Sequence, residues 1–246
     1  GFGEHVVEGL DPSQFSILRL GQGGTIARLL KQKNYTHMVL AGGVKITNVW
    51  DLRPDFRAFI FFAKLGWQLG KDHSLLEAAK AAIEGEGFTL LGADELVAGL
   101  RAEQGAYSDK SPSEADWKDI AQAWTIAKTL GAIDVGQGCI VQRSYVLTVE
   151  ASEGTEAMIA RSKDLRRTRK GGVLVKVMKP QQDKRLDLPT IGPDTVRQAA
   201  EAGLAGIAVE AGGAMVLQAQ SVHELANKHG LFVIATTEAE VQEQVS

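Results

Sequence analysis

The run Gly172-Val-Leu-Val-Lys-Val177 decides the fold class, because its β-branched residues predict a strand. A helix is predicted next, from Gly192 to Ala202. Pro193 and Gly203 bracket it, since proline favours the first turn of a helix and glycine the position after its end. Gly206-Ile-Ala-Val-Glu210 predicts a second strand. Strand, helix and strand in this order indicate an α/β protein.

The same alternation extends in both directions from this segment. Cys139–Gln142 and Tyr145–Val149 predict a hairpin whose turn is Arg143-Ser144, and a helix is expected from Glu153 to about Lys163. The basic run from Arg161 to Lys170 is predicted to be a solvated loop. Toward the C-terminus, the expected elements are strands at 214–217 and 231–235 around a helix at 222–228.

The first half of the chain carries weaker signals of the same kind. Strands are predicted at 16–20, 36–41 and 88–91, and helices at 25–33 and 74–84. The polar stretch 101–113 contains Pro112 and predicts a loop. A helix then begins after Ser113, an N-cap residue type that is followed by Asp116 three positions on, and it ends at Gly131.

Two domains are expected within the 246 residues, because domains commonly hold about 100–150 residues. We predict an N-terminal Rossmann-like layer over residues 1–131 and a C-terminal α/β domain over residues 132–246. The helix that ends at Gly131 is expected to connect them.

Composition and charge restrict the class of protein. A chain that is 44% hydrophobic and 23% charged is typical of globular proteins, and a net charge of -3 gives no electrostatic basis for binding nucleic acid. The single cysteine, Cys139, suits a reducing compartment and is interpreted as a small buried residue. No apolar run reaches the roughly 20 residues of a membrane-spanning helix, and no signal peptide is evident, so we expect a cytoplasmic protein.

The short motifs of the chain say little about its chemistry. Gly21-Gln-Gly-Gly24 suggests dinucleotide binding, but Ile26 stands where that fingerprint needs a third glycine. We interpret the segment as a glycine-rich helix entry, with an NAD-dependent oxidoreductase as the alternative. The five histidines lack metal-ligand spacing, and Ser144 lies in a turn without the sequence of a nucleophile elbow.

The segment from Lys176 to Gly192 carries the densest polar chemistry. A strand is followed by an irregular loop with three cations and two carboxylates, and the loop ends at a helix N-terminus, whose N–H groups favour anions. Cations suit phosphate oxygens, whereas Asp183 and Asp187 suit a hard divalent ion or a water to be activated. A solvated polar loop without chemistry is the alternative interpretation.

Several longer motifs occur in order along the second half. They are Asp134-Val-Gly-Gln-Gly138, Glu150-Ala-Ser-Glu-Gly-Thr-Glu-Ala-Met158, Gly172-Val-Leu-Val-Lys176, Gln182-Asp-Lys-Arg-Leu-Asp-Leu-Pro-Thr-Ile-Gly192 and Ala202-Gly-Leu-Ala-Gly-Ile207. Together they resemble the C-terminal domain of the UDP-2,3-diacylglucosamine pyrophosphatases of the LpxI type. Ala41-Gly-Gly-Val44 and Lys71-Asp-His-Ser-Leu-Leu76 resemble that family's N-terminal domain more loosely.

This resemblance implies a two-domain, usually dimeric enzyme of lipid A synthesis that binds a lipid-linked nucleotide sugar between its domains. It implies Mg2+-dependent attack of water on the β-phosphorus, which releases UMP and 2,3-diacylglucosamine 1-phosphate. The family's essential aspartate corresponds to Asp187. Lys176 and Arg185 are expected to stabilise charge on the pyrophosphate. Candidate metal ligands are Asp187, Asp183 and Glu150, and candidate substrate-binding residues are Lys179, Gln182, Thr155, Thr190, Gly42 and Gly43.

The chain departs from the family in two respects. The family's opening glycine-rich turn has no counterpart here, and Gly1 is expected to lie downstream of it; the loop from Arg101 to Ser113 is also shorter than the family's and lacks its Pro-Gly-rich run. A nucleotide-sugar binding or regulatory protein of the same fold, without turnover, is therefore the alternative function. We expect contact with the inner membrane surface to be peripheral and transient, through the acyl chains of the substrate. Phe61, Phe62 and Trp67 are candidates for an acyl groove, although core packing is the simpler interpretation.

Overall fold

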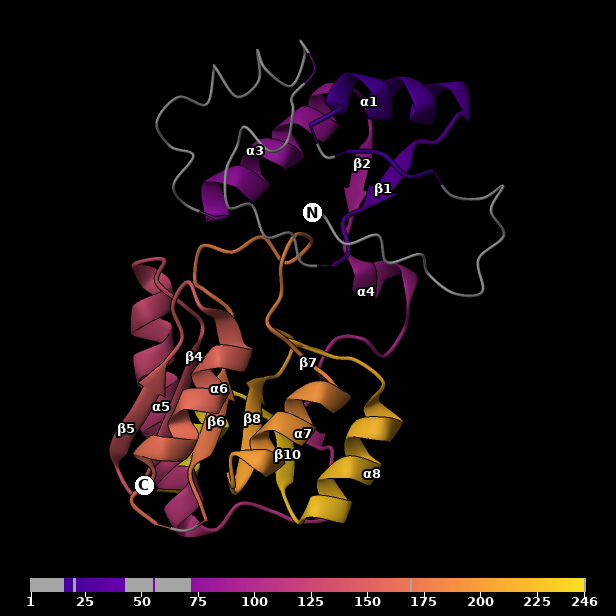
Figure 1. Cartoon of the computed structure of the whole chain (residues 1–246). Coiled ribbons are helices and arrows are strands. Elements are labelled where there is room, and N and C mark those ends of the chain that lie inside the picture. Colours follow the sequence, from indigo (N-terminus) through magenta and orange to yellow (C-terminus); the bar gives the residue numbers. More distant parts are fainter. Residues whose placement is uncertain (1–15, 20, 43–54, 56–71, 169, 246) are drawn as a thin grey trace. The chain divides into compact units, whose positions relative to one another are not determined.

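The computed structural model describes residues 16–19, 21–42, 55, 72–168 and 170–245 (Figure 1). The chain divides into two compact units, Gly1–Leu90 and Leu91–Ser246. Strands and helices alternate through most of the described residues, which confirms the α/β class.

The second unit is built on a mixed six-stranded sheet in the order β3-β10-β8-β6-β4-β5 (Figure 1). Strands β6, β8 and β10 are parallel, whereas β4 runs antiparallel to both β6 and β5, and β3 antiparallel to β10. The strands are β3 (Gly105–Ala106), β4 (Gly138–Gln142), β5 (Tyr145–Val149), β6 (Val173–Lys176), β8 (Gly206–Glu210) and β10 (Phe232–Thr236). A separate two-stranded sheet pairs β7 (Thr190–Ile191) with β9 (Met215–Val216).

Helices cover both faces of this sheet, because residues of one strand alternate between two hydrophobic clusters. Val173 and Val175 pack in the cluster that contains α5 (Glu114–Ala132) and α9 (Glu238–Val245). Leu174, between them, packs in the cluster that contains α6 (Gly154–Leu165), α7 (Pro193–Glu201) and α8 (Ala219–His229). The unit is therefore a three-layer sandwich.

Cys139 lies in the hydrophobic cluster that contains α5 and α9. Burial raises the pKa of its thiol to about 12, so its interpretation as a small buried residue is confirmed.

One edge of the sheet collects polar side chains from several strands. The parallel strands β6, β8 and β10 end there at Lys176, Glu210 and Thr236. Strand β5 also ends at this edge, because it is antiparallel to β4, which is itself antiparallel to β6; Glu150 follows it. The carboxyl ends of parallel strands are where open α/β sheets bind their ligands.

The hairpin predicted at Arg143-Ser144 is confirmed, and the structure shows what stabilises it. Both residues have positive φ angles, 51° and 61°, a conformation that non-glycine residues adopt at a cost. The carboxylate of Asp119 on α5 offsets this cost by accepting their two backbone N–H groups, each at 2.8 Å. The turn is thus held by the neighbouring helix.

In the first unit, the described elements are α1 (Gly23–Gln32), β1 (His37–Val39), α3 (Asp72–Gly85) and β2 (Thr89–Leu91). β1 and β2 form a two-stranded sheet, and the N–H of Thr89 donates to the carbonyl of Thr36 at 2.9 Å. A Rossmann-like layer in this part of the chain stays a prediction.

The predicted domain boundary after residue 131 differs from the structure. α5 does not connect two domains; its residues Ile120, Trp124 and Ala127 are buried in the same cluster as Cys139 and Val175. Residues 91–131 therefore belong to the second unit. An amphipathic stripe shows that a helix packs on a core, and it does not show which core.

Other local predictions also need correction. Residues 16–19 are exposed and have no regular structure where a strand was predicted. The predicted loop 101–113 contains β3, whose Ala106 pairs with Ile234. The first part of the predicted basic loop is helical, since α6 continues to Leu165. There, Arg161 donates to the carbonyl of Val149 and pairs with Glu153. None of the helices in the described ranges is long and apolar enough to cross a membrane.

Candidate active site

Lys176 lies at the end of β6 and is buried, with only 4% of its surface exposed. Its Nζ donates to Thr155 Oγ1 at 2.7 Å and to the carbonyl of Thr190 at 3.5 Å. Burial lowers the pKa of this ammonium, and the negative charges of Glu150 and Asp187 oppose that shift. The carboxyl edge of the sheet therefore holds a desolvated lysine between two carboxylates.

Glu150 is also buried, immediately after β5. Its Oε1 accepts from Thr155 at 2.6 Å, and its Oε2 has no hydrogen-bond partner within the described part of the chain. Gly136 and Gly138 give it room: a Cβ on Gly138 would lie 2.8 Å from Oε2, and one on Gly136 would lie 2.0 Å from the carbonyl oxygen of Glu150. The sequence did not reveal that Gly136 and Gly138 make room for Glu150, although two glycines so close together were a signal of close packing.

Thr155 links these two groups from the first turn of α6. Its hydroxyl accepts from Lys176 and donates to Glu150, so its one proton is already committed. In this arrangement Thr155 orients Lys176 and keeps only an acceptor position for another molecule. Its predicted contact with substrate stays a prediction.

Asp187 is exposed on the loop between β6 and β7. Its Oδ2 accepts from Nε2 of Gln182 at 3.1 Å, and Oε1 of Gln182 accepts from the backbone N–H of Lys179 at 3.2 Å. Gln182 therefore ties Asp187 to the start of the loop. The structure brings together Asp187, Gln182, Lys176, Thr155 and Glu150 from the predicted set.

The other two predicted cations each have a carboxylate partner of their own. Arg185 binds Asp183 through Nε at 3.1 Å and Nη2 at 2.7 Å. Lys179 pairs with Asp134 at 2.7 Å. These pairs partly neutralise charge that was expected to face a pyrophosphate, so the roles of Arg185, Lys179 and Asp183 stay predictions.

Three further positions were predicted to bind substrate. Thr190 offers its carbonyl to Lys176, while its hydroxyl donates to the carbonyl of Leu188 at 2.9 Å. Gly42 is an exposed residue of the first unit with φ +97°, and Gly43 lies outside the described residues, as do Phe61, Phe62 and Trp67.

The start of α7 is a weaker anion site than the sequence suggested. The N–H of Gly192 donates to Thr195 Oγ1 at 3.3 Å, and Pro193 has no N–H to offer. Asp194 adds a carboxylate in the first turn. The buried ammonium of Lys176 is therefore the stronger attraction for a phosphate at this edge.

A metal site assembled from protein alone is absent from the described residues, where no group of three or more His, Cys, Asp or Glu side chains could hold an ion. Glu150 is buried and Asp183 is paired with Arg185. Mg2+ commonly uses only one or two carboxylates, together with substrate phosphates and waters. Exposed Asp187 fits that mode of binding, so it is the residue that would hold the ion.

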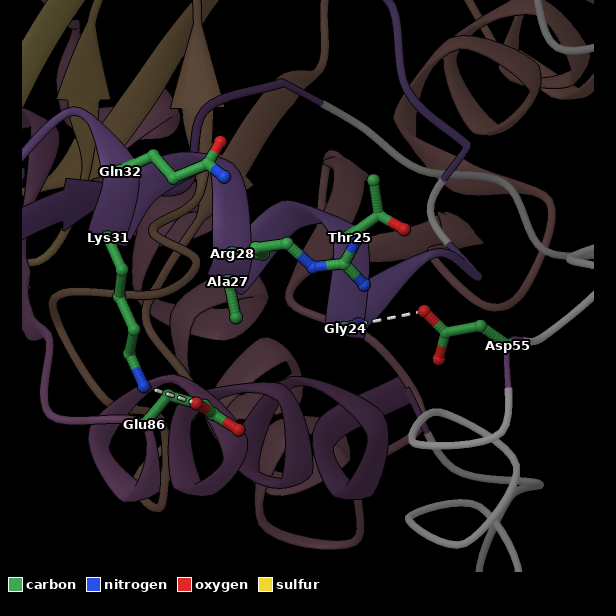
Figure 2. Close-up of a pocket in the computed structure, with 8 residues that line it drawn as sticks. All are labelled: Gly24, Thr25, Ala27, Arg28, Lys31, Gln32, Asp55 and Glu86. Carbon is green, nitrogen blue, oxygen red and sulfur yellow. Dashed lines mark hydrogen bonds and ion pairs between the residues drawn. The ribbon is translucent and has the colours of Figure 1, made fainter.

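The glycine-rich turn leads to a cavity of about 600 Å³ in the first unit (Figure 2). Its lining comprises Gly24, Thr25, Ala27, Arg28, Lys31, Gln32, Asp55 and Glu86. The N–H of Gly24, near the start of α1, donates to Oδ2 of Asp55 at 2.9 Å, so a carboxylate takes the place that a bound phosphate would need. This contact supports the interpretation of Gly21–Gly24 as a helix entry.

Comparison with known proteins now identifies the class to which this α/β fold and polar edge belong. The LpxI N-terminal domain family matches residues 1–100, and the LpxI C-terminal domain family matches residues 103–234. The chain is 38% identical over 222 residues to the UDP-2,3-diacylglucosamine pyrophosphatase LpxI of Caulobacter vibrioides, an alignment that covers 87% of the chain and 79% of that protein. The chain belongs to the LpxI family, and the resemblance stated from the motifs is confirmed.

The proximity of Asp187 and Lys176 can be measured by following lysine side chains in a carbon-13 NMR titration. One resonance, identified by its loss in Lys176→Arg, should titrate below the ordinary lysine pKa of about 10.4, because burial disfavours the charged form. Asp187→Asn should lower that pKa further, since it removes a charge that raises it. Glu224→Gln, at an exposed position on α8, serves as control and should leave the pKa of Lys176 unchanged. Equal pKa values in wild type and Asp187→Asn would contradict the arrangement.

Proposed function

We propose that this protein hydrolyses the pyrophosphate of UDP-2,3-diacylglucosamine to UMP and 2,3-diacylglucosamine 1-phosphate in lipid A synthesis. The observation that carries the proposal is the 38% identity, over most of the chain, to a UDP-2,3-diacylglucosamine pyrophosphatase. The site adds chemical support, because a buried cation and an exposed carboxylate share the carboxyl edge of the sheet.

Hydrolysis of a pyrophosphate needs water held in line with the bond that breaks and compensation of charge on the phosphate oxygens. In this proposal Asp187 acts in one of two ways: it accepts a hydrogen bond from that water and takes its proton, or it binds Mg2+. Lys176 has three N–H donors, and Thr155 and the carbonyl of Thr190 account for two, so one remains for a phosphate oxygen. Because Lys176 is already desolvated and held, little reorganisation accompanies the reaction.

Mg2+ held by Asp187 would supply further positive charge to the phosphate oxygens. Arg185 and Lys179 add little net positive charge around the loop, because Asp183 and Asp134 balance them. We also propose that the protein is a cytoplasmic homodimer that contacts the inner membrane surface only through the acyl chains of its substrate. The Rossmann-like character of the N-terminal layer belongs to the same proposal.

The direct test is release of UMP from UDP-2,3-diacylglucosamine by the purified protein in the presence of Mg2+. Asp187→Asn should lower kcat by about 100-fold or more, because it removes the water-orienting charge at an exposed position without disturbing the core. Glu224→Gln should retain wild-type kcat, and both variants should unfold at the wild-type temperature. Binding of substrate by wild type without UMP release would favour the nucleotide-sugar binding protein instead.

A requirement for divalent metal is expected from the charge of the substrate. Exhaustive chelation should abolish turnover, and added Mg2+ should restore it, because a single lysine beside Asp187 compensates only part of the pyrophosphate charge. The measurement is UMP release across a Mg2+ titration of the chelated enzyme. Full activity after chelation would leave Lys176 and Arg185 as the charge-stabilising groups.

The attacked phosphorus can be identified by isotope. We expect water to attack the β-phosphorus, which is attached to the sugar, with UMP as the leaving group; the family resemblance is the basis of this choice. Turnover in oxygen-18 water, analysed by mass spectrometry, should place the label in 2,3-diacylglucosamine 1-phosphate. Label in UMP would reverse the orientation of the pyrophosphate relative to Asp187.

A further inference from the structure

An ion pair outside the predicted site holds the beginning of the Asp187 loop. Glu210 is the last residue of β8, next to Val209, which pairs with Lys176 across the sheet. Its Oε1 and Oε2 accept from Nζ of Lys128 on α5 at 2.8 and 2.7 Å. Both side chains are partly buried, with 20% and 25% of their surfaces exposed.

This pair binds both backbone polar groups of Met178. The N–H of Met178 donates to Oε2 of Glu210 at 2.7 Å, and the carbonyl of Met178 accepts from Nζ of Lys128 at 3.1 Å. Met178 lies two residues beyond β6, where sheet hydrogen bonds no longer fix the chain. At the start of the loop, the side chains of Lys128 and Glu210 therefore take the place of the hydrogen bonds that neighbouring strands make within the sheet.

The restraint continues from Met178 to Asp187. Lys179, the next residue, pairs with Asp134, and Gln181 donates to the carbonyl of Gly131 at 2.8 Å. The backbone N–H of Lys179 donates to Gln182, which in turn donates to Asp187. A continuous series of contacts thus leads from Glu210 to the carboxylate of Asp187.

The surroundings of Glu210 are shaped to keep it in this position. A Cβ on Gly213 would lie 2.8 Å from both Cγ and Cδ of Glu210, so only glycine lets the side chain fold back at the end of β8. A partly exposed ion pair contributes little to global stability. The pair instead fixes geometry, because it binds the backbone of Met178 beyond the end of β6.

We propose that Glu210 and Lys128 are positioning residues: they fix the start of the loop and so set Asp187 against Lys176. The inference rests on the proposed function of Asp187, and neither residue of the pair contacts the substrate in it. Loss of the pair lets the loop shift, and displacements of about 1 Å at a reacting group can lower turnover about 100-fold.

The test compares Glu210→Ala, Glu210→Gln and Lys128→Met with Lys128→Arg, and Glu224→Ala, at an exposed position on α8, is the matched control. We expect Glu210→Ala to lower kcat about 10- to 100-fold with little change in KM. Glu210→Gln should fall between it and wild type, because the amide oxygen still accepts from Met178 while the charge is lost. Lys128→Arg should retain most activity, since it keeps the charge and the donors.

Amide hydrogen exchange supplies a readout that does not need turnover. In Glu210→Ala, the backbone amides of residues 178–187 should exchange faster than in wild type. Strand β6, which precedes this loop, and strand β8, which ends at residue 210, should keep wild-type protection. Should Glu210→Ala fail to fold, Lys128→Met removes the same pair from the other side. Wild-type kcat, or unchanged exchange over 178–187, in folded variants of both residues overturns the proposal. If the wild-type enzyme releases no UMP, the proposed function fails and the exchange result alone decides the positioning.

Discussion

The buried ammonium of Lys176 is the interaction on which the carboxyl edge of the sheet depends. A charge removed from water is costly unless hydrogen bonds and opposite charge compensate it. Thr155 and the carbonyl of Thr190 supply the hydrogen bonds, and Glu150 supplies charge through Thr155. Through these contacts, α6 and the chain that enters β7 both bind to that one group.

A desolvated cation is useful because it attracts phosphate oxygens more strongly than a solvated one does. The same desolvation lowers the pKa of Lys176, and the negative charges of Glu150 and Asp187 oppose that shift. Asp187 thereby has two effects, one on the proposed water and one on the charge of Lys176. The exposed loop that carries Asp187 and the buried end of β6 are therefore coupled electrostatically.

Many residues of this candidate site could be predicted from the sequence, because they lie within motifs of the family. They are Lys176, Asp187, Glu150, Thr155 and Gln182. Their type and order pointed to phosphate chemistry. The pairing of Lys179 could not be predicted, because its partner Asp134 lies 45 positions away, whereas Arg185 pairs with Asp183 only two positions away. The same limit hid Lys128 and Glu210, which are 82 positions apart and carry no motif.

The sequence by itself determined the central elements of the second unit, because strands such as Gly206–Glu210 and the capped helix after Ser113 are encoded by local periodicity and capping residues. It also determined the family, through motifs that are contiguous in the chain. It did not determine β3, which lies in the predicted loop 101–113. Only the tertiary structure decided that α5 packs on the sheet as part of the second unit, and which charges meet at its edge. The physical reason is that packing partners and ion pairs join residues distant in sequence, and amphipathic patterns specify that a face is buried without specifying against what.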